Sequence, residues 1–469
     1  MADGGNRRNA TGEVPIQFVQ PSRSGKLLQY EHAAKETCTL MDWLGYGPHI
    51  RQARSEAYKV HDRLLTALSG GSATWITTGS KAEGLTCYLE SDRDIICVNN
   101  NLICIEEGVD SSNILKETTI LRACSRISYP GHYILLLQRY GTTIPKRVDN
   151  ALCDDGYGRT FLSSDLYVNE CLNIKPTEGQ ETHERAGPST PSTFYGGALH
   201  TDIVHALHLY CPSILTRWAA RPRNWPTPDI VQEVVSVGAV VTPVGLKGSD
   251  YEHVEWRLCF NAGENVLVNN LTDTMVKVYV LLKMVKQDVL KPRKKEVTSF
   301  TVKNIVLWIA ENNPQSLLHE RSLLHWLHEG LYALRVAIDT KELPYYMIPE
   351  RNLMAACALE HEQKLSWIAT INDMIEEGPI MILRLPQIRR ALIAHTEPLR
   401  WYSGRKIEME MLVLICMNRI TLGMDEETDV IVQAAITRSA DIRKEVRHRM
   451  IMEGRRENNL PDFYQSMLS

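Results

Sequence analysis

The sequence predicts an α+β fold, in which a mixed β-sheet and one long helix are followed by a largely helical region. Apolar, strand-like segments separated by turn-rich stretches occur at Leu102–Glu106, His132–Gln138, Thr160–Leu162 and Ala198–Leu209. From Trp218 onward amphipathic helical patterns dominate, interrupted by a predicted strand pair near Gly238–Thr242 and Glu255–Phe260. A chain of 469 residues can bury a large core, and this length predicts two to four domains.

The long helix is predicted over Ile50–Leu68, where apolar residues recur at helical spacing and Gly70-Gly71 provides a normal helix end. Residues 1–28 are polar and lack a sustained period, which predicts a flexible segment. The predicted inward face of the helix carries Ala53, Ala57, Val60, Leu64 and Leu65. Its outer face carries the basic residues Arg51, Arg54, Lys59 and Arg63. Such a face is usually solvated, and contact with a nucleic acid is the alternative.

The composition is that of an ordinary soluble globular protein, with 44% hydrophobic and 23% charged residues. The net charge of −4 excludes a chain that is basic overall, so nucleic-acid binding would require a local patch. Eleven cysteines without a C-x-x-C pair predict reduced thiols and a cytoplasmic location. The first residues, MADGGNRRNATGE, lack the apolar core of a signal peptide, and the apolar run Met411–Met417 is too short to cross a bilayer. No membrane association is therefore expected.

The most informative stretch is Thr77–Asn99, which reads TTGSKAEGLTCYLESDRDIICVN. Gly79-Ser80 is a turn pair that leaves backbone N–H groups free to meet a phosphate, with a short helix-like segment beyond it. At the other end, Asp92 and Asp94 precede an apolar run, and alternation along a strand would turn both carboxylates to one face and Arg93 to the other. Two such carboxylates repel each other unless a cation lies between them, and two Mg²⁺ ions would provide it.

A phosphate cradle before a strand with paired carboxylates is the arrangement that nucleotidyl transfer requires. Taken alone, an Asp-x-Asp is usually a solvated strand end, and a Gly-Ser pair is usually a loop. Two metal ions also need a further ligand, and Asp202 in the predicted strand Ala198–Leu209 can supply it from a neighbouring strand. The bland alternative for Asp202 is an acid at a strand edge. Upstream of this strand, the polar stretch Gly179–Ser192 predicts a loop.

Three histidines surround Asp202 and raise the question of zinc. His200 and Asp202 would share one strand face, whereas His205 would lie on the other, which argues against a common tetrahedral site. Structural histidines are the better interpretation, and no zinc is expected.

Gly79-Ser80 followed by Asp92-x-Asp94 resembles the motif of the nucleotidyltransferase superfamily. The flanking sequence is similar to the cyclic GMP–AMP synthase-like receptors, which share the male-abnormal family domain. The likeness covers about residues 45–360. It implies a bilobed nucleotidyltransferase fold: a core lobe with a long spine helix over residues 29–215, and a helical lobe over 216–360 that completes the active site. Residues 361–469 are a helical extension outside the likeness.

The resemblance also implies roles for individual residues. Asp92, Asp94 and Asp202 would be the catalytic acids that hold two Mg²⁺ (or Mn²⁺) ions, and Gly79 and Ser80 would grip the donor triphosphate. The segment WRLCFNAGE is similar to the WRLSF-type strand of the family, and the segments LLK and TSFTVK follow it in the expected order. By this likeness the nucleotide contacts would be made by Arg257, by Lys283 and Ser299 on phosphates, and by Phe300 under a base.

Two departures from the family pattern leave the choice of base open. Phe300 stands where the family often has Tyr, and Cys259 stands where Ser is commoner. Without the resemblance, Lys283 would equally suit a helix surface and Phe300 a core position. The mammalian DNA-sensing member carries a His/Cys insertion after the WRLSF-type strand, but the stretch from Phe260 to Lys283 holds neither residue.

The function implied by the resemblance is innate immune sensing by synthesis of a cyclic dinucleotide from two nucleoside triphosphates, such as ATP and GTP. The activating ligand would be double-stranded RNA in preference to DNA, and dimer formation on that ligand is left open. A ligand pressing on the spine helix would align the adjoining loop Thr78–Leu85 with metals and triphosphate. Two alternatives remain: a catalytically silent member that serves as a binding or scaffold protein, and a linear oligonucleotide synthase.

Overall fold

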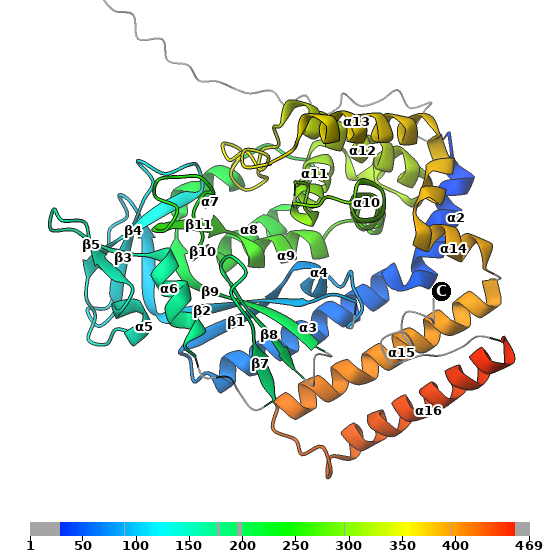
Figure 1. Ribbon diagram of the computed structural model, residues 1–469, viewed down its shortest axis with the longest axis horizontal. Helices are drawn as coiled ribbons and strands as arrows, with labels where there is room; N and C mark the ends of the chain where they lie inside the picture. The colour runs from blue at the N-terminus through cyan, green and yellow to red at the C-terminus, as the bar shows by residue number, and fades with distance from the viewer. Residues whose placement is uncertain are drawn as a thin grey trace, which may run out of the picture.

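The computed structural model describes residues 29–88, 90–174, 176, 179–194, 199–294, 296–394 and 396–454 (Figure 1). The predicted flexible segment of residues 1–28 lies outside them. The described chain combines a mixed β-sheet with many helices, and those from α9 onward follow the last strand (Figure 1). This arrangement confirms the predicted mixture of α and β structure with a helical C-terminal region.

The strands described join in one sheet of mixed direction. They are β1 Ala73–Thr78, β2 Arg93–Glu106, β3 Thr119–Cys124, β4 His132–Arg139, β5 Leu152–Asp154, β6 Thr160–Leu162, β7 Gln180–Thr182, β8 Ser189–Phe194, β9 Leu199–Tyr210, β10 Ala239–Thr242 and β11 Glu255–Cys259. The long strands β2 and β9 run parallel at its centre, and β2 also pairs with β1 and β3. The pairings β2–β3–β4–β11–β10–β9–β2 form a closed circuit.

The α-helices are α2 Glu31–Met41, α3 Pro48–Leu68, α4 Gly79–Ala82, α5 Lys146–Asp149, α6 Ser164–Leu172, α7 Pro212–Ala219, α8 Pro228–Val237, α9 Asn261–Asn269, α10 Asp273–Met284, α11 Ser299–Asn312, α12 Leu323–Thr340, α13 His361–Glu376, α14 Pro386–Ile393, α15 Thr396–Thr421 and α16 Val430–Met452. Short π-helical segments occur at Asp42–Tyr46 and Val285–Leu290, and 3-10 segments at Gln315–Leu317, Glu320–Ser322 and Gly378–Arg384. The strands predicted at Leu102–Glu106, His132–Gln138, Thr160–Leu162 and Ala198–Leu209 are confirmed.

The predicted long helix is confirmed as α3, but its predicted faces are wrong in its first half. Arg51 and Arg54, expected on the outer face, are only 8% and 4% exposed, and Ala53, expected inside, is exposed. The reason is that α3 is enclosed by elements from distant parts of the chain, which bring carboxylates to both guanidinium groups. Lys59 and Arg63 are exposed, as predicted.

One further expectation about the sheet is wrong and one is confirmed. The stretch Gly179–Ser192, predicted as a loop, contains β7 and the start of β8, which form an antiparallel pair at the edge of the sheet. The predicted strand pair near residues 240 and 257 is confirmed as β10 and β11, which join β9 and β4 in the main sheet.

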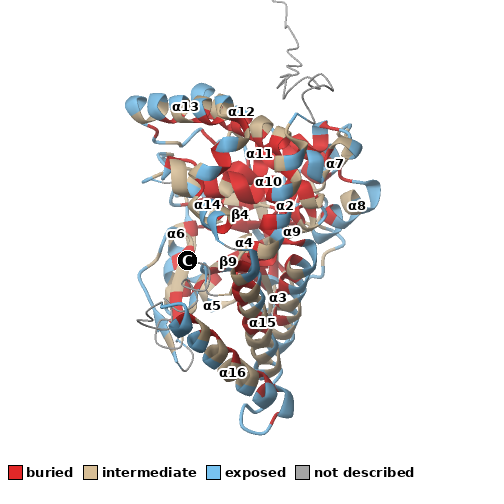
Figure 2. Ribbon diagram, turned by 90° about the vertical axis from the view of Figure 1, so that its right-hand side faces the viewer, coloured by how far each residue is buried: buried red, intermediate tan, exposed pale blue. Residues whose placement is uncertain are grey.

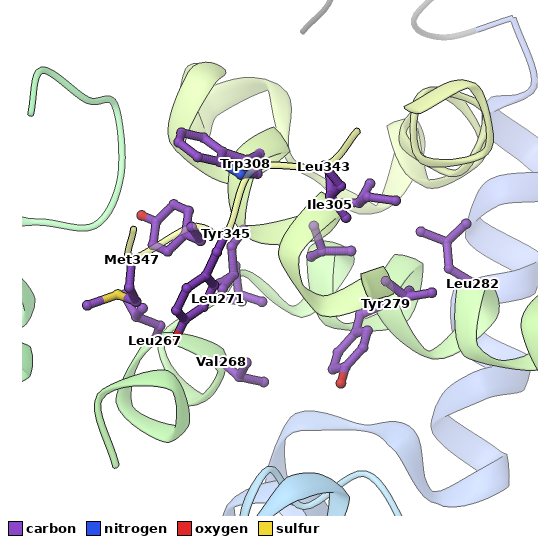
Figure 3. Close-up of a cluster of buried hydrophobic side chains, with 14 of the residues drawn as sticks. Leu267, Val268, Leu271, Tyr279, Leu282, Ile305, Trp308, Leu343, Tyr345 and Met347 are labelled. Carbon is purple, nitrogen blue, oxygen red and sulfur yellow. The ribbon is translucent and has the colours of Figure 1, made fainter. Parts of the chain in front are cut away.

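The core is continuous between the sheet and the helices. One cluster of buried apolar side chains includes residues from Ala34 in α2 to Leu399 in α15. Figure 3 shows part of it, where α9, α10 and α11 meet the segment that carries Leu343, Tyr345 and Met347. The helices of residues 361–454 are also part of the fold: α15 lies along α3, and α16 packs on α15 over a small second core (Figures 1 and 2).

Among the described residues, no helix is both long enough and apolar enough to span a lipid bilayer.

Candidate active site

The Gly79-Ser80 elbow forms at the end of β1. Thr78 is the register partner of Asp94 on β2, and Gly79 turns the chain into the short helix α4 with a φ of +65°. A side chain at Gly79 would place its Cβ 2.7 Å from Asp94 Oδ2. Glycine is therefore required here twice, once by the left-handed backbone and once by the close approach of the carboxylate.

We expect Gly79→Ala to destabilise the protein by about 1–3 kcal/mol, because it combines backbone strain with displacement of the Asp94 carboxylate. Gly71→Ala is a matched control, since Gly71 has a φ of +84° but nothing within 4 Å of a built Cβ. Urea unfolding of both variants separates the two effects. Equal losses in the two variants would show that Asp94 does not need the space at Gly79.

The sheet brings two of the three predicted acids together. Asp94 and Asp202 are register partners on the parallel strands β2 and β9, so they share a face of the sheet on adjacent strands. Asp92 is exposed and immediately precedes β2. The crowding is electrostatic as well as steric: the pKa of Asp94 is raised to about 6, by burial first and then by the negative charges of Asp202 and Asp92.

Carboxylate oxygens are the donors that Mg²⁺ prefers, and a cluster of mutually repelling carboxylates is relieved by a cation. The donor chemistry therefore fits the two expected metal ions. In the part of the chain that the structure describes, no three His, Cys, Asp or Glu side chains are grouped so that they could hold a metal ion, so the three predicted acids are not gathered into a ready-made metal site.

Arg93, between the two acids, points to the other side of β2 and fixes the strand to the spine helix α3. Its guanidinium donates to Thr77 Oγ1 at 2.7 Å, forms an ion pair with Asp62 at 3.1 Å and lies 2.9 Å from His61 Nδ1. It also lies over the ring of Tyr58. The alternation of Asp92-Arg93-Asp94 predicts that Arg93 points away, but its four partners could not be found from the sequence.

Lys283 reaches the elbow from α10, and its Nζ donates a hydrogen bond to Ser80 Oγ. Burial lowers the pKa of Lys283. Two residues predicted to bind phosphates thus meet, although they are 203 positions apart in the sequence. A lysine ammonium beside free backbone N–H groups at a helix start is a combination suited to an anion.

A network of buried charged side chains lies next to the Gly79-Ser80 elbow, and the sequence does not predict it. Lys303 of α11 lies between Glu83, which directly follows α4, and Glu264 of α9, at 2.7 and 3.2 Å. The hydroxyl of Tyr345 donates to Glu264 at 2.7 Å, and that of Tyr279 donates to Glu83 at 3.3 Å. The network ties the elbow to the helical region. Only the apolar surroundings of Lys303 in the sequence could have indicated its burial.

The remaining predicted nucleotide contacts are placed as follows. Ser299 is the first residue of α11, and Phe300 is half-buried with its ring 5.5 Å from that of Tyr345. Lys303 lies over the Phe300 ring, so Phe300 borders the buried network. Arg257 is half-buried on β11, opposite His132 on β4. The pKa of the half-buried Arg351 is lowered by burial first and then by the charge of Arg257.

The four basic residues of the spine helix divide into two pairs. Arg51 is paired with Asp273 at 2.9 Å and Arg54 with Glu410 at 2.7 Å, so neither lies on an open surface. Lys59 is exposed and pairs with Glu56, and Arg63 is exposed.

Comparison with known families identifies one match. Residues 274–370 match the model described as the Mab-21 protein HhH/H2TH-like domain. The matched residues begin in α10, follow the last strand of the sheet and include Lys283, Ser299, Phe300 and Lys303. No curated protein matches the chain. The match supports the male-abnormal family indicated by the motif, and with it a nucleotidyltransferase-like protein.

Proposed function

We propose that this protein is a bilobed, template-independent nucleotidyltransferase that joins two nucleoside triphosphates into a cyclic dinucleotide. One observation carries the proposal: the hydrogen bond between Lys283 and Ser80 lies beside the register pair Asp94–Asp202. Gly79 connects the two, because it directly precedes Ser80 and packs closely against the Asp94 carboxylate. An anion grip next to clustered carboxylates suits a substrate that carries a triphosphate with its divalent metal ions.

In this proposal each residue has a defined task. Asp92, Asp94 and Asp202 hold two Mg²⁺ ions, which activate the attacking hydroxyl and neutralise the leaving pyrophosphate when bound. The backbone of Gly79 and Ser80, the Ser80 hydroxyl and the Lys283 ammonium bind the donor triphosphate. Asp202 helps the acceptor hydroxyl to lose its proton. Arg257, Ser299 and Phe300 hold the bases and the second phosphate group. Ring closure needs a second transfer, so the linear intermediate turns over within the same site.

We further propose that the enzyme is a cytoplasmic innate immune sensor activated by double-stranded RNA. The burial of Arg51 and Arg54 limits the contact that the spine helix can make. A duplex would meet the exposed end of α3 that carries Lys59 and Arg63. Because the net charge is −4, this contact would be local and sensitive to salt.

The test is to incubate the pure protein with four labelled nucleoside triphosphates and Mg²⁺ or Mn²⁺, with and without duplex RNA or DNA. We expect a metal-dependent product that resists phosphatase. Asp92→Asn should lower its yield at least about a hundredfold, since even outer-shell changes at metal sites cost 10- to 100-fold. A product whose 5′-triphosphate is open to phosphatase would indicate a linear synthase. No product under any condition would indicate a silent binding or scaffold protein.

A further inference from the structure

The loop between the elbow and the metal-binding acids is held from inside the core lobe by a buried lysine. Of this loop, residues 85–88 and 90–92 are described, and we call them the motif loop. Lys81 in α4 is 1% exposed, and its Nζ donates to the carbonyl oxygens of Cys87 and Tyr88. These bonds fix two carbonyl groups of the motif loop but none of its N–H groups.

The N–H side of the motif loop is held by α15, which lies outside the family match. The Glu410 carboxylate accepts a hydrogen bond from the backbone N–H of Tyr88 at 3.0 Å. The same carboxylate accepts from Nε and Nη2 of Arg54 on the spine helix, at 3.0 and 2.7 Å. The side chains of Arg54 and Glu410 are 5% and 1% exposed. One buried carboxylate therefore joins the spine helix to the motif loop.

A second contact of α15 lies one helical turn earlier. Lys406 forms an ion pair with Glu90, and the other oxygen of Glu90 accepts a hydrogen bond from the N–H of Cys87 at 3.0 Å. Because residues four apart share a helix face, Lys406 and Glu410 present one edge of α15 to the motif loop.

The C-terminal end of α15 contacts His61, a partner of Arg93, which lies between Asp92 and Asp94 in the sequence. Thr421 Oγ1 lies 3.1 Å from His61 Nε2, and His61 Nδ1 lies 2.9 Å from the guanidinium of Arg93. Burial, with the charge of Arg93, lowers the pKa of His61 to about 3, so the ring is neutral at physiological pH. Arg93 then donates to Nδ1 and Nε2–H donates to Thr421. α15 thus contacts the motif loop, which precedes Asp92, directly, and it contacts Arg93, which follows Asp92, through His61.

We propose that Glu410 is a positioning residue for nucleotidyl transfer, which holds the motif loop and hence Asp92 in register with the spine helix. α15 occupies the Arg54 side of that helix, so the motif loop is supported there from within the chain. Stability alone does not explain this arrangement, because replacing a buried ion pair with apolar side chains is often neutral or stabilising. The inference rests on the proposed function only in that Asp92 is taken as catalytic.

The test compares Glu410→Gln with Glu408→Gln. Glu408 is on the same helix but pairs with Arg405 and Arg438, away from the motif loop. Hydrogen exchange of the backbone amides of the motif loop, at 85–88 and 90–92, should be about tenfold faster in Glu410→Gln and unchanged in Glu408→Gln. We expect kcat to fall about tenfold or more in Glu410→Gln, with KM for the triphosphates within about twofold, since misplacement of catalytic groups acts on the chemical step.

Exchange at the motif loop that is unchanged in Glu410→Gln, or faster exchange with an unchanged kcat, would overturn the positioning role. If the wild-type protein makes no product, the proposed function fails, and the exchange comparison alone then decides whether Glu410 anchors the loop. Should Glu410→Gln not fold, Lys406→Met makes the same test at a shallower contact, with exchange expected to rise about threefold. Unchanged exchange in that variant would count against the proposal equally.

Discussion

Asp94→Asn is expected to abolish nucleotidyl transfer while stabilising the metal-free protein. The pKa of Asp94 is raised from its ordinary value of 3.8 to about 6, by burial first and then by the charges of Asp202 and Asp92. The folded protein therefore resists ionisation of this group more than the unfolded chain does. The carboxyl group is desolvated although the residue as a whole is exposed, so solvent screens part of the effect. At neutral pH the ionised carboxylate therefore lowers the free energy of unfolding by only about 1 kcal/mol.

The sign of the pH dependence follows from the same shift. Between about pH 4 and pH 6 the folded state keeps a proton on Asp94 that the unfolded chain has lost, so this group's contribution to stability falls as the pH rises through that range. In Asp94→Asn this contribution is absent. The stability advantage of the variant should therefore be small near pH 4 and reach its full size by about pH 7.

Thermal unfolding in EDTA from pH 4 to 8, and then with Mg²⁺ or Mn²⁺, measures both effects. The wild type should gain stability from metal as RT ln(1 + [L]/Kd), and the variant should gain much less. Asp250→Asn, which changes an exposed carboxylate away from the site, is the control and should behave as the wild type. A variant that is less stable than the wild type in EDTA, or that keeps the full metal response, would contradict the carboxylate cluster.

Lys303→Met is expected to cause the largest loss of stability. The lysine is 7% exposed and lies between Glu83 and Glu264, which are 1% and 3% exposed. Its removal leaves two buried carboxylates without a cation. Breaking a buried pair in this way costs about 3–5 kcal/mol, because the remaining charge has lost both its partner and its hydration.

Urea unfolding measures this loss, and two comparisons identify its cause. Lys294→Met removes an exposed pair with Glu360 and should change the free energy of unfolding by less than about 0.5 kcal/mol. Adding Glu83→Gln and Glu264→Gln to Lys303→Met should restore much of the loss, since no uncompensated charge then remains. A triple variant as unstable as Lys303→Met would mean that packing, rather than charge, holds this network together.

The local parts of this site could be predicted from the sequence. The Gly79-Ser80 elbow and the Asp92-x-Asp94 motif lie within sixteen positions of one another, and Asp94 lies on β2 as predicted. Asp92 precedes the strand, so the predicted shared face of the two acids stays a prediction. Asp202 could be predicted because it lies within a clear strand pattern. The prediction of a loop at Gly179–Ser192 is wrong because polar residues and prolines are typical of loops, whereas here they form the edge strand β7 and the start of β8, which pairs with both β7 and β9.

The faces of the spine helix could not be predicted, for a physical reason. A charged side chain is normally solvated, and only a partner from elsewhere in the fold reverses this expectation. The partners of Arg51 and Arg54 lie 222 and 356 positions away, and those of Lys303 are also on other elements. Periodicity within the helix holds no information about such distant carboxylates.

The contact between Tyr88 and Glu410 has a consequence for synthesis of the chain. These residues are 322 positions apart, so at ribosomal rates of 5–20 residues per second roughly 15–65 s separate their translation. Lys283, which donates a hydrogen bond to Ser80, is likewise translated 203 residues after it. A nascent polypeptide therefore carries the elbow and the motif loop long before Lys283 and Glu410, the residues that contact them, have been synthesised.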